Sequence, residues 1–443
     1  MKSLRTLLFL AASATALVGA PDPAQPVPDR LDLPNALRFA LENNFTIREA
    51  RERVNQTQGQ LTTARAGYLP KATVQAGYSR VSDQIALGRD TESWSGSAGV
   101  QQTLYAGGAV SANASAARSV RDAAVYQLEA TINQVLVGVR TGYYNVLRAV
   151  DTIKVREQAL SLLEEELKNA RNRYEAGAGA QFDVLRAEVA LANGRPPLIT
   201  ARNDLRIAIE ELRQLLGYTN RGSTDLTKVP EFIGQLTFGD EQFDLVQCLD
   251  LAHRQRPELQ ALKYGAEASQ AGVRAARAGY RPTLAATAGW QMVGNGVSPH
   301  SLTGQSSYDG WAVGLQSQWA VFDGRATAGR IRSAKSQAEQ ARLVLQEQEL
   351  SIDVEVRRAF ASWQQAVELV TASNKVVEQA NEALRLSRAR FDVGAATQLD
   401  VLQAQVALTD AGNNQVQSLF AYNVAIAQLR AAIGQRDPEV AVK

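Results

Sequence analysis

Few side chains in this sequence have the types and spacing that catalysis or metal binding requires. His253 and His300 are the only histidines, are far apart and read as surface or capping residues, and Cys248 is the only cysteine. Serine, histidine and aspartate occur, but no motif gathers them into a hydrolase triad. No glycine-rich run carries the lysine and hydroxyl of a phosphate-binding loop. The sequence therefore predicts no enzyme, no cofactor and no metal site.

Two aspartates belong to a motif that occurs twice. Residues 173–185 return 217 positions later as residues 390–402, and each copy has a glycine turn followed by Gln-x-Asp-Val-Leu. The aspartates are Asp183 and Asp400. Thr397 precedes Asp400 by three residues, which predicts a capping box. Ala180 takes the place of that threonine in the first copy, so a capping box does not explain Asp183.

The elements that position these motifs are also duplicated. Residues 105–217 align with 322–434 at one fixed offset, and residues 33–70 align with 245–282 at an offset five residues smaller. The difference falls in a loop, where insertions are tolerated. We therefore divide the chain into a first repeat (33–217), a connector (218–244), a second repeat (245–434) and a tail (435–443).

Each repeat contains a long helical hairpin, about 107–217 and about 324–434. Apolar residues recur at helical spacing, and nothing breaks the first pattern until Gly177. A helix of roughly 70 residues would be about 100 Å long. After the glycine turn a second helix returns, which predicts an antiparallel coiled coil. Pro196 and Pro197 should kink or interrupt the first return helix, because proline lacks an N–H and clashes with the preceding turn.

Each repeat also contains a β-hairpin, about 71–105 and about 283–322. Apolar and aromatic residues alternate there with small or polar residues, so each hairpin has one apolar face. Four tryptophans fall in the hairpins: Trp94, Trp290, Trp311 and Trp319. We interpret Trp94 and Trp311 as strand-end members of an aromatic girdle at the membrane surface.

The first 20 residues have the features of a secretory signal peptide: a basic start, an apolar run and small residues. No later stretch has 18 uninterrupted apolar residues, so a membrane could be crossed only by β-structure. Four strands cannot close a barrel, since the smallest membrane barrels use eight. Three protomers would supply twelve. Balanced charge, 47 basic against 45 acidic residues, argues against a nucleic-acid surface.

With these features the chain resembles the TolC family of outer-membrane channel-tunnel proteins. The resemblance covers nearly all of the mature chain and rests on the tandem repeat and the two copies of Arg-(Tyr/Phe)-x-x-Gly-Ala-x-x-Gln-(Phe/Leu)-Asp-Val-Leu. It implies a mainly helical protomer that forms a homotrimer with a 12-stranded β-barrel in the outer membrane and a periplasmic α-barrel. It also implies two partners, a periplasmic adaptor (membrane fusion) protein and an inner-membrane transporter, in a tripartite efflux pump or type I secretion system.

The resemblance also implies roles for particular residues. The glycine turns would form the tip on which the adaptor docks, with Tyr174, Gly177, Ala178, Phe391, Gly394 and Ala395 as contacts. Asp400, with Asp183, would form an acidic periplasmic aperture. A second acid found in the family is replaced by Gln403, and by Arg186 in the first repeat. An acidic gate in this chain would therefore carry fewer negative charges. The alternative is a soluble periplasmic coiled-coil adaptor or scaffold, which would not need the amphipathic β-hairpins.

Overall fold

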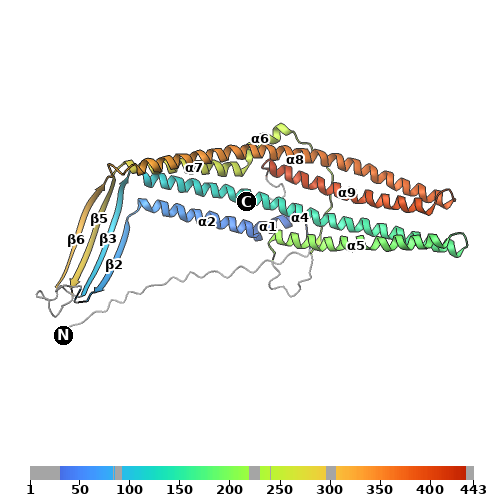
Figure 1. Ribbon diagram of the computed structural model, residues 1–443, viewed down its shortest axis with the longest axis horizontal. Helices are drawn as coiled ribbons and strands as arrows, with labels where there is room; N and C mark the ends of the chain where they lie inside the picture. Colours follow the sequence, from blue (N-terminus) through green and yellow to red (C-terminus); the bar gives the residue numbers. More distant parts are fainter. Residues whose placement is uncertain are drawn as a thin grey trace.

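The computed structural model describes residues 30–82, 84, 92–218, 230–239, 241–295 and 306–435. The predicted signal peptide, most of the tail and His300 lie outside these residues. The protein is elongated, with a sheet at one end. At the other end, which we call the tip, lie the two turns that connect the long helices to their return helices (Figure 1). The main elements are α1 (Leu33–Asn43), α2 (Phe45–Arg65), β2 (Lys71–Arg80), β3 (Glu92–Ala106), α4 (Ala109–Glu175), α5 (Gln181–Leu216), α6 (Leu245–Gln255), α7 (Pro257–Arg277), β5 (Thr283–Asn295), β6 (Ser306–Gln318), α8 (Ala326–Asp392) and α9 (Gln398–Ala432).

The longest elements are α4 and α8, which have 67 residues each. Helix α4 packs against α2 along the half nearer the sheet and against α5 along the half nearer the tip (Figure 1). Helix α8 packs against α7 and α9 in the same way. The mainly helical class and the tandem arrangement of long antiparallel hairpins are thus confirmed.

In the first repeat, the C-terminal end of α5 meets the N-terminal end of α2. Gly217 ends α5 with a φ of 72°, and a Cβ there would come within 2.5 Å of the Asn43 carbonyl oxygen. Asn44 caps α2 by accepting from the backbone N–H groups of Thr46 and Ile47, while its amide donates to the Leu215 carbonyl at 2.6 Å. One side chain therefore closes both helix ends.

The equivalent junction in the second repeat uses a buried arginine. Arg256 donates to Glu258 and to Glu355, and reaches the Ala432 carbonyl at the end of α9. Burial of a guanidinium is tolerated because two carboxylates and a carbonyl satisfy it.

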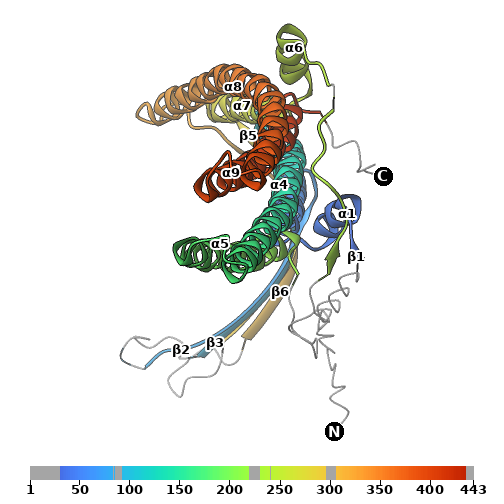
Figure 2. The ribbon, with the colours of Figure 1, turned by 90° about the vertical axis from the view of Figure 1, so that its right-hand side faces the viewer.

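Two hydrophobic cores lie where α1 and α6 cover the long helices. Figure 2 shows both short helices on the convex side of the curved layer. The first core joins α1, α4 and α5, and the second joins α6, α8 and α9. Tyr143 donates to the Leu31 carbonyl, and burial raises its pKa to about 12. The same hydroxyl also donates to the carbonyl of Ile233. The two bonds hold the two-residue strands β1 (Arg30–Leu31) and β4 (Glu231–Phe232) against α4.

The four-stranded sheet is antiparallel throughout, in the order β2-β3-β5-β6. Its register aligns Val74, Ala98, Trp290 and Trp311 across the four strands, so the predicted apolar faces of both hairpins form one continuous face. A bulge at Leu104 shifts the register near the helices. Strands β2 and β6 are the edges of the sheet.

The predicted interruption of the first return helix is wrong. Helix α5 runs from Gln181 to Leu216 with Pro196 and Pro197 inside it. Leu191 and Leu198 are buried on either side of the prolines. Packing against the core thus retains helical backbone where two backbone bonds are missing, since tertiary contacts override local propensity. Among the described residues, no helix is apolar over a length sufficient to cross a membrane.

Candidate functional site

The two turns at the tip have the same backbone construction. Gly177 has a φ of 72° and Gly394 a φ of 77°. The residue after each glycine closes the helix end, because Ala178 N–H donates to the Arg173 carbonyl and Ala395 N–H to the Arg390 carbonyl, both at 2.8 Å. A Cβ at either glycine would meet nothing within 4 Å, so the left-handed backbone, not crowding, favours glycine here.

The structure brings the two turns together through Arg173. Its guanidinium lies 4.3 Å from the centroid of the Phe391 ring, and its Nη2 lies 3.7 Å from an oxygen of Asp392. Phe391 is therefore half-buried, whereas Tyr174, Ala178 and the two glycines are exposed. Of the six predicted docking residues, five form an exposed surface and Phe391 also joins one turn to the other.

The predicted aperture residues occupy different environments. Asp400 accepts from the Thr397 N–H at 2.7 Å and from its hydroxyl at 2.8 Å, and the predicted capping box is present. These bonds from Thr397 hold the pKa of Asp400 below its usual value. Asp183 is half-buried in the first turn of α5, where Ala180 provides no side-chain cap. Gln403 is exposed.

A buried polar seam between α4 and α9 lies beside the tip, and the sequence reasoning missed it. Glu166, Gln398 and Gln405 are each 4 % exposed or less. Gln405 donates to the Leu162 carbonyl at 3.4 Å, but both amide atoms of Gln398 and one oxygen of Glu166 have no hydrogen-bond partner among the described residues. Unsatisfied buried polar atoms cost free energy, so the seam stabilises the contact between α4 and α9 less than an apolar contact would. Periodicity gave no signal for it, because burial of the seam depends on how the hairpins pack.

Burial raises the pKa of Glu166, partly offset by the neighbouring Gln398 amide and then by Arg388 and Arg173. The folded chain holds this proton more tightly than the unfolded chain, so Glu166 contributes most stability below the ordinary pKa of 4.5 and loses it as the pH rises through the higher folded value. We expect Glu166→Gln to raise the thermal unfolding temperature at pH 7 and to have much less effect at pH 4.

Glu165→Gln is the matched control, because Glu165 is 61 % exposed and only pairs with Arg388 at 3.6 Å. This variant should change the unfolding temperature little at either pH. Equal unfolding temperatures for Glu166→Gln and the unaltered chain at pH 7 would contradict the assignment of a buried charge.

One of the two proposed girdle residues differs from its predicted position. Trp94 is near the loop end of β3, as expected, and its ring covers Gly294. Trp311 is 80 % exposed but lies in the middle of β6, paired with Trp290, so its strand-end position was wrong. The misplacement arose because β6 extends back to Ser306.

Exposed aromatic residues also occur where the sheet meets the helices. They occur in both repeats and are 43 % to 85 % exposed: Tyr68, Tyr105, Tyr280, Trp319 and Phe322. The sequence repeats an Ala-Gly-Tyr triplet at 66–68 and 278–280, which contained a signal for two of these residues.

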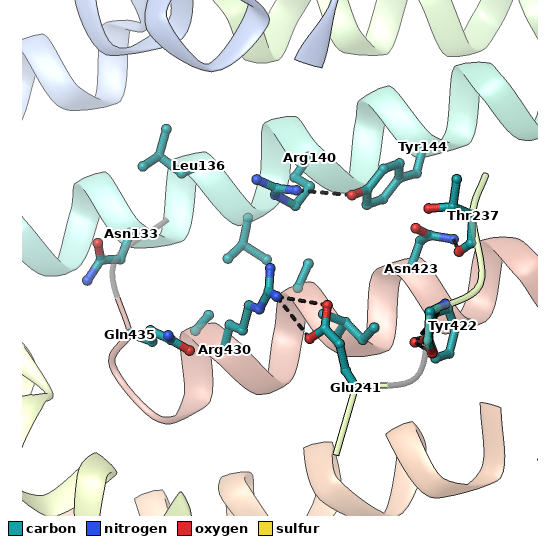
Figure 3. A pocket seen from close by; sticks show the side chains of 15 residues that line it. Asn133, Leu136, Arg140, Tyr144, Thr237, Glu241, Tyr422, Asn423, Arg430 and Gln435 are labelled. Atoms are coloured by element: carbon teal, nitrogen blue, oxygen red, sulfur yellow. Dashed lines mark hydrogen bonds and ion pairs between the residues drawn. The ribbon is translucent and has the colours of Figure 1, made fainter. Parts of the chain in front are cut away.

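A polar cavity of about 220 Å³ joins α4 to α9 midway along the rod. Figure 3 shows Arg430 paired with Glu241, and Arg140 donating to Tyr144. None of the residues that sequence analysis selected lines this cavity. Cys248 is buried in the second core, and His253 bonds to Asp353 at 2.7 Å, which joins α6 to α8.

Comparison with known proteins gives consistent matches along the chain. The sequence pattern of the family described as outer membrane efflux protein matches residues 36–218 and 248–435. Outer membrane protein TolC from Vibrio cholerae is 25% identical over 377 residues, 84% of each chain. Protein CyaE from Bordetella pertussis is 26% identical over 396 residues, 86% of this chain and 80% of that protein.

Solved structures share the fold. The Campylobacter jejuni CmeC outer membrane channel superposes with a TM-score of 0.76 at 18% identity, over 91% of this chain and 85% of that one. The outer membrane protein VceC from Vibrio cholerae gives 0.75 at 20% identity, over 91% and 96%.

Proposed function

Because the chain belongs to the outer membrane efflux protein family, we propose that three copies form the exit duct of a tripartite efflux pump or a type I secretion system. The family consists of outer-membrane channels with a periplasmic tunnel, and the chain is not an enzyme. The duct would be passive, with its energy supplied by an inner-membrane transporter reached through a periplasmic adaptor.

One observation carries the trimer: equivalent faces of the two return helices are covered differently. Leu402 and Val416 on α9 are each 8 % exposed, whereas their counterparts on α5, Leu185 and Ile199, are 52 % and 68 % exposed. Helix α9 is covered because it packs on α4, as the contacts of Gln405 and Gly412 with α4 illustrate. Helix α5 packs on α4 within its own hairpin, but among the described residues no further long helix covers the face that carries Leu185 and Ile199.

Helix α8 leaves the complementary face uncovered. Three of the α4 residues that contact α9 are Arg148, Val155 and Leu162, and all three are half-buried. Their counterparts on α8, Gln365, Ala372 and Gln379, are exposed. Placing α5 of one copy on α8 of the next would repeat the internal contact between chains. A head-to-tail contact of this kind generates a closed ring when the rotation closes.

The sheet supports the same arrangement. Strands β2 and β6 are edges, and pairing β6 of one copy with β2 of the next would make a closed twelve-stranded sheet. The continuous apolar face would then contact lipid.

We place adaptor docking at the exposed tip residues Tyr174, Gly177, Ala178, Gly394 and Ala395, with Phe391 beneath them.

Asp183, Asp400 and Gln403 would line the periplasmic aperture. If three copies of Asp400 attract cations there, Asp400→Ala should weaken block of single channels by divalent cations, and Asp410→Ala, farther along α9, should not. Block that persists unchanged in Asp400→Ala would remove Asp400 from the aperture.

Fractionation tests the function as a whole. We expect a heat-modifiable trimer in the outer membrane, and deletion of the gene should sensitise cells to pump substrates or stop secretion of a cargo. A soluble periplasmic species would instead support the adaptor or scaffold alternative.

A further inference from the structure

Basic residues are concentrated in the four segments that join the sheet to the helices. Segments 60–72, 106–121, 274–283 and 318–335, which we call the basic band, contain eleven basic residues and one acidic residue. The whole chain has a net charge of only +2. The basic residues are Arg65, Lys71, Arg118, Arg121, Arg274, Arg277, Arg281, Arg325, Arg330, Arg332 and Lys335.

The opposite end of the sheet has the reverse balance. Segments 79–93 and 294–309, which connect the strands there, contain two basic and four acidic residues. The charge asymmetry is therefore a property of one end of the sheet and not of the sheet as a whole.

The basic band is available to an external partner. Ten of its eleven basic residues are exposed, and Arg121 is half-buried. Within the described residues only Arg121 and Arg330 form ion pairs, with Asp122 and Asp323. Unpaired cations of one sign repel one another, so the arrangement costs stability unless anions approach it.

One side of the basic band contains a cavity, which we call the recess. Arg274, Arg277 and Arg281 line a cavity of about 540 Å³ together with Gly107, Gly108, Ser111 and Ser115. Arg274 donates to the Ser115 hydroxyl and Arg281 to the Gly107 carbonyl, both at 3.3 Å, which orients two guanidinium groups. The residues lining this cavity include no carboxylate. Guanidinium groups with serine hydroxyls are suited to binding phosphate oxygens.

The exposed aromatic residues fix the level of the band. Tyr68 and Tyr280 shortly precede β2 and β5, and Trp319 directly follows β6, so all three lie at the end of the sheet that carries the basic band. Tyrosine and tryptophan are enriched at the membrane–water boundary, and cations just beyond it attract anionic headgroups.

We propose that the basic band binds the phosphate groups of anionic lipids in the leaflet on the helical side of the outer membrane. The inference rests on the proposed function, because it needs the sheet to cross the membrane. The recess around Arg277 holds individual headgroups, and the rest of the band fixes how far the sheet enters the bilayer.

The test uses the full chain purified in detergent. The protein is incubated with equal amounts of phosphatidylglycerol and phosphatidylcholine with matched acyl chains, and the bound lipids are quantified by native mass spectrometry. We expect phosphatidylglycerol to be enriched. Arg274→Gln, Arg277→Gln and Arg281→Gln together should reduce the enrichment, by up to about fivefold for each arginine. The three corresponding Arg→Lys changes should retain most of it.

The matched control neutralises Arg53, Lys168 and Lys375, which are exposed but distant from the sheet, and should leave the enrichment unchanged. Equal binding of both lipids by the unaltered trimer would overturn the proposal while leaving the channel function intact. Enrichment abolished by millimolar inorganic phosphate would assign the recess to free phosphate and also overturn it. A chain that neither trimerises nor enters membranes would instead refute the proposed function.

Discussion

Leu185→Asp combined with Ile199→Asp is expected to abolish the trimer and efflux while leaving each protomer folded. Both side chains are more than half exposed in the single chain, so a carboxylate at either position remains hydrated there. In the trimer the same positions would be covered by α8 of the next copy. Each substitution would then lose about 1.5–3 kcal/mol of apolar burial. A carboxylate in the covered contact would cost several kcal/mol more.

Loss of the heat-modifiable trimer on unheated gels, with an unchanged circular dichroism spectrum, would support this contact. Val189→Asp is the matched control. Val189 is 59 % exposed, and its counterpart Val406 remains 58 % exposed although α9 already packs on α4. Position 189 therefore lies outside the contact, and its variant should trimerise. A normal trimer with Asp at both 185 and 199 would contradict the proposed packing of α5 on α8.

Gly177→Val with Gly394→Val is expected to stop efflux without preventing trimer formation. Both glycines have left-handed backbone, where a side chain costs about 1–2 kcal/mol per residue, and valine is a poor choice because it is β-branched. The turns would rearrange, and the surface on which the adaptor docks would be lost. Efflux is measured as dye accumulation in cells, and trimer formation by gel mobility.

Gly177→Asn with Gly394→Asn separates the two causes of failure. Asparagine tolerates the left-handed backbone, and nothing lies within 4 Å of a new Cβ, so the turns should keep their shape. If efflux falls in this variant as well, the added side chain obstructs a partner. If efflux survives in the asparagine variant and fails with valine, the shape of the turns is what the adaptor requires. Normal efflux in both variants would count against docking at the tip.

Sequence alone predicted much of the protomer, because the decisive signals are local or repeated. Helical periodicity predicted the rods that became α4 and α8. Alternation predicted the apolar faces, and the register that aligns Val74 with Trp311 confirms them. The Thr397–Asp400 capping box was also predicted correctly, since a cap involves residues only three apart.

Other features could not be read from local pattern. Pro196 and Pro197 predict a kink or an interruption, and the interruption does not occur because packing on both sides keeps α5 continuous. The seam around Glu166 is polar and buried, so composition gave no reason to suspect it. The basic band combines four segments that are distant in sequence, and the pairing of β3 with β5 and the packing of α4 on α7 bring both repeats together at this end of the sheet.

The sequence by itself determined the duplication, the element order and the two glycine turns, because backbone conformation and amphipathic periodicity are encoded within short windows. The tertiary structure decided which of two nearly equivalent faces is covered. Because the two repeats have the same pattern, α5 could pack on α8 as α9 packs on α4. Within one chain only the packing of α9 on α4 is formed. The packing of α9 on α4 leaves the equivalent face of α5 and the equivalent face of α8 exposed. This difference appears only when the two repeats are packed side by side.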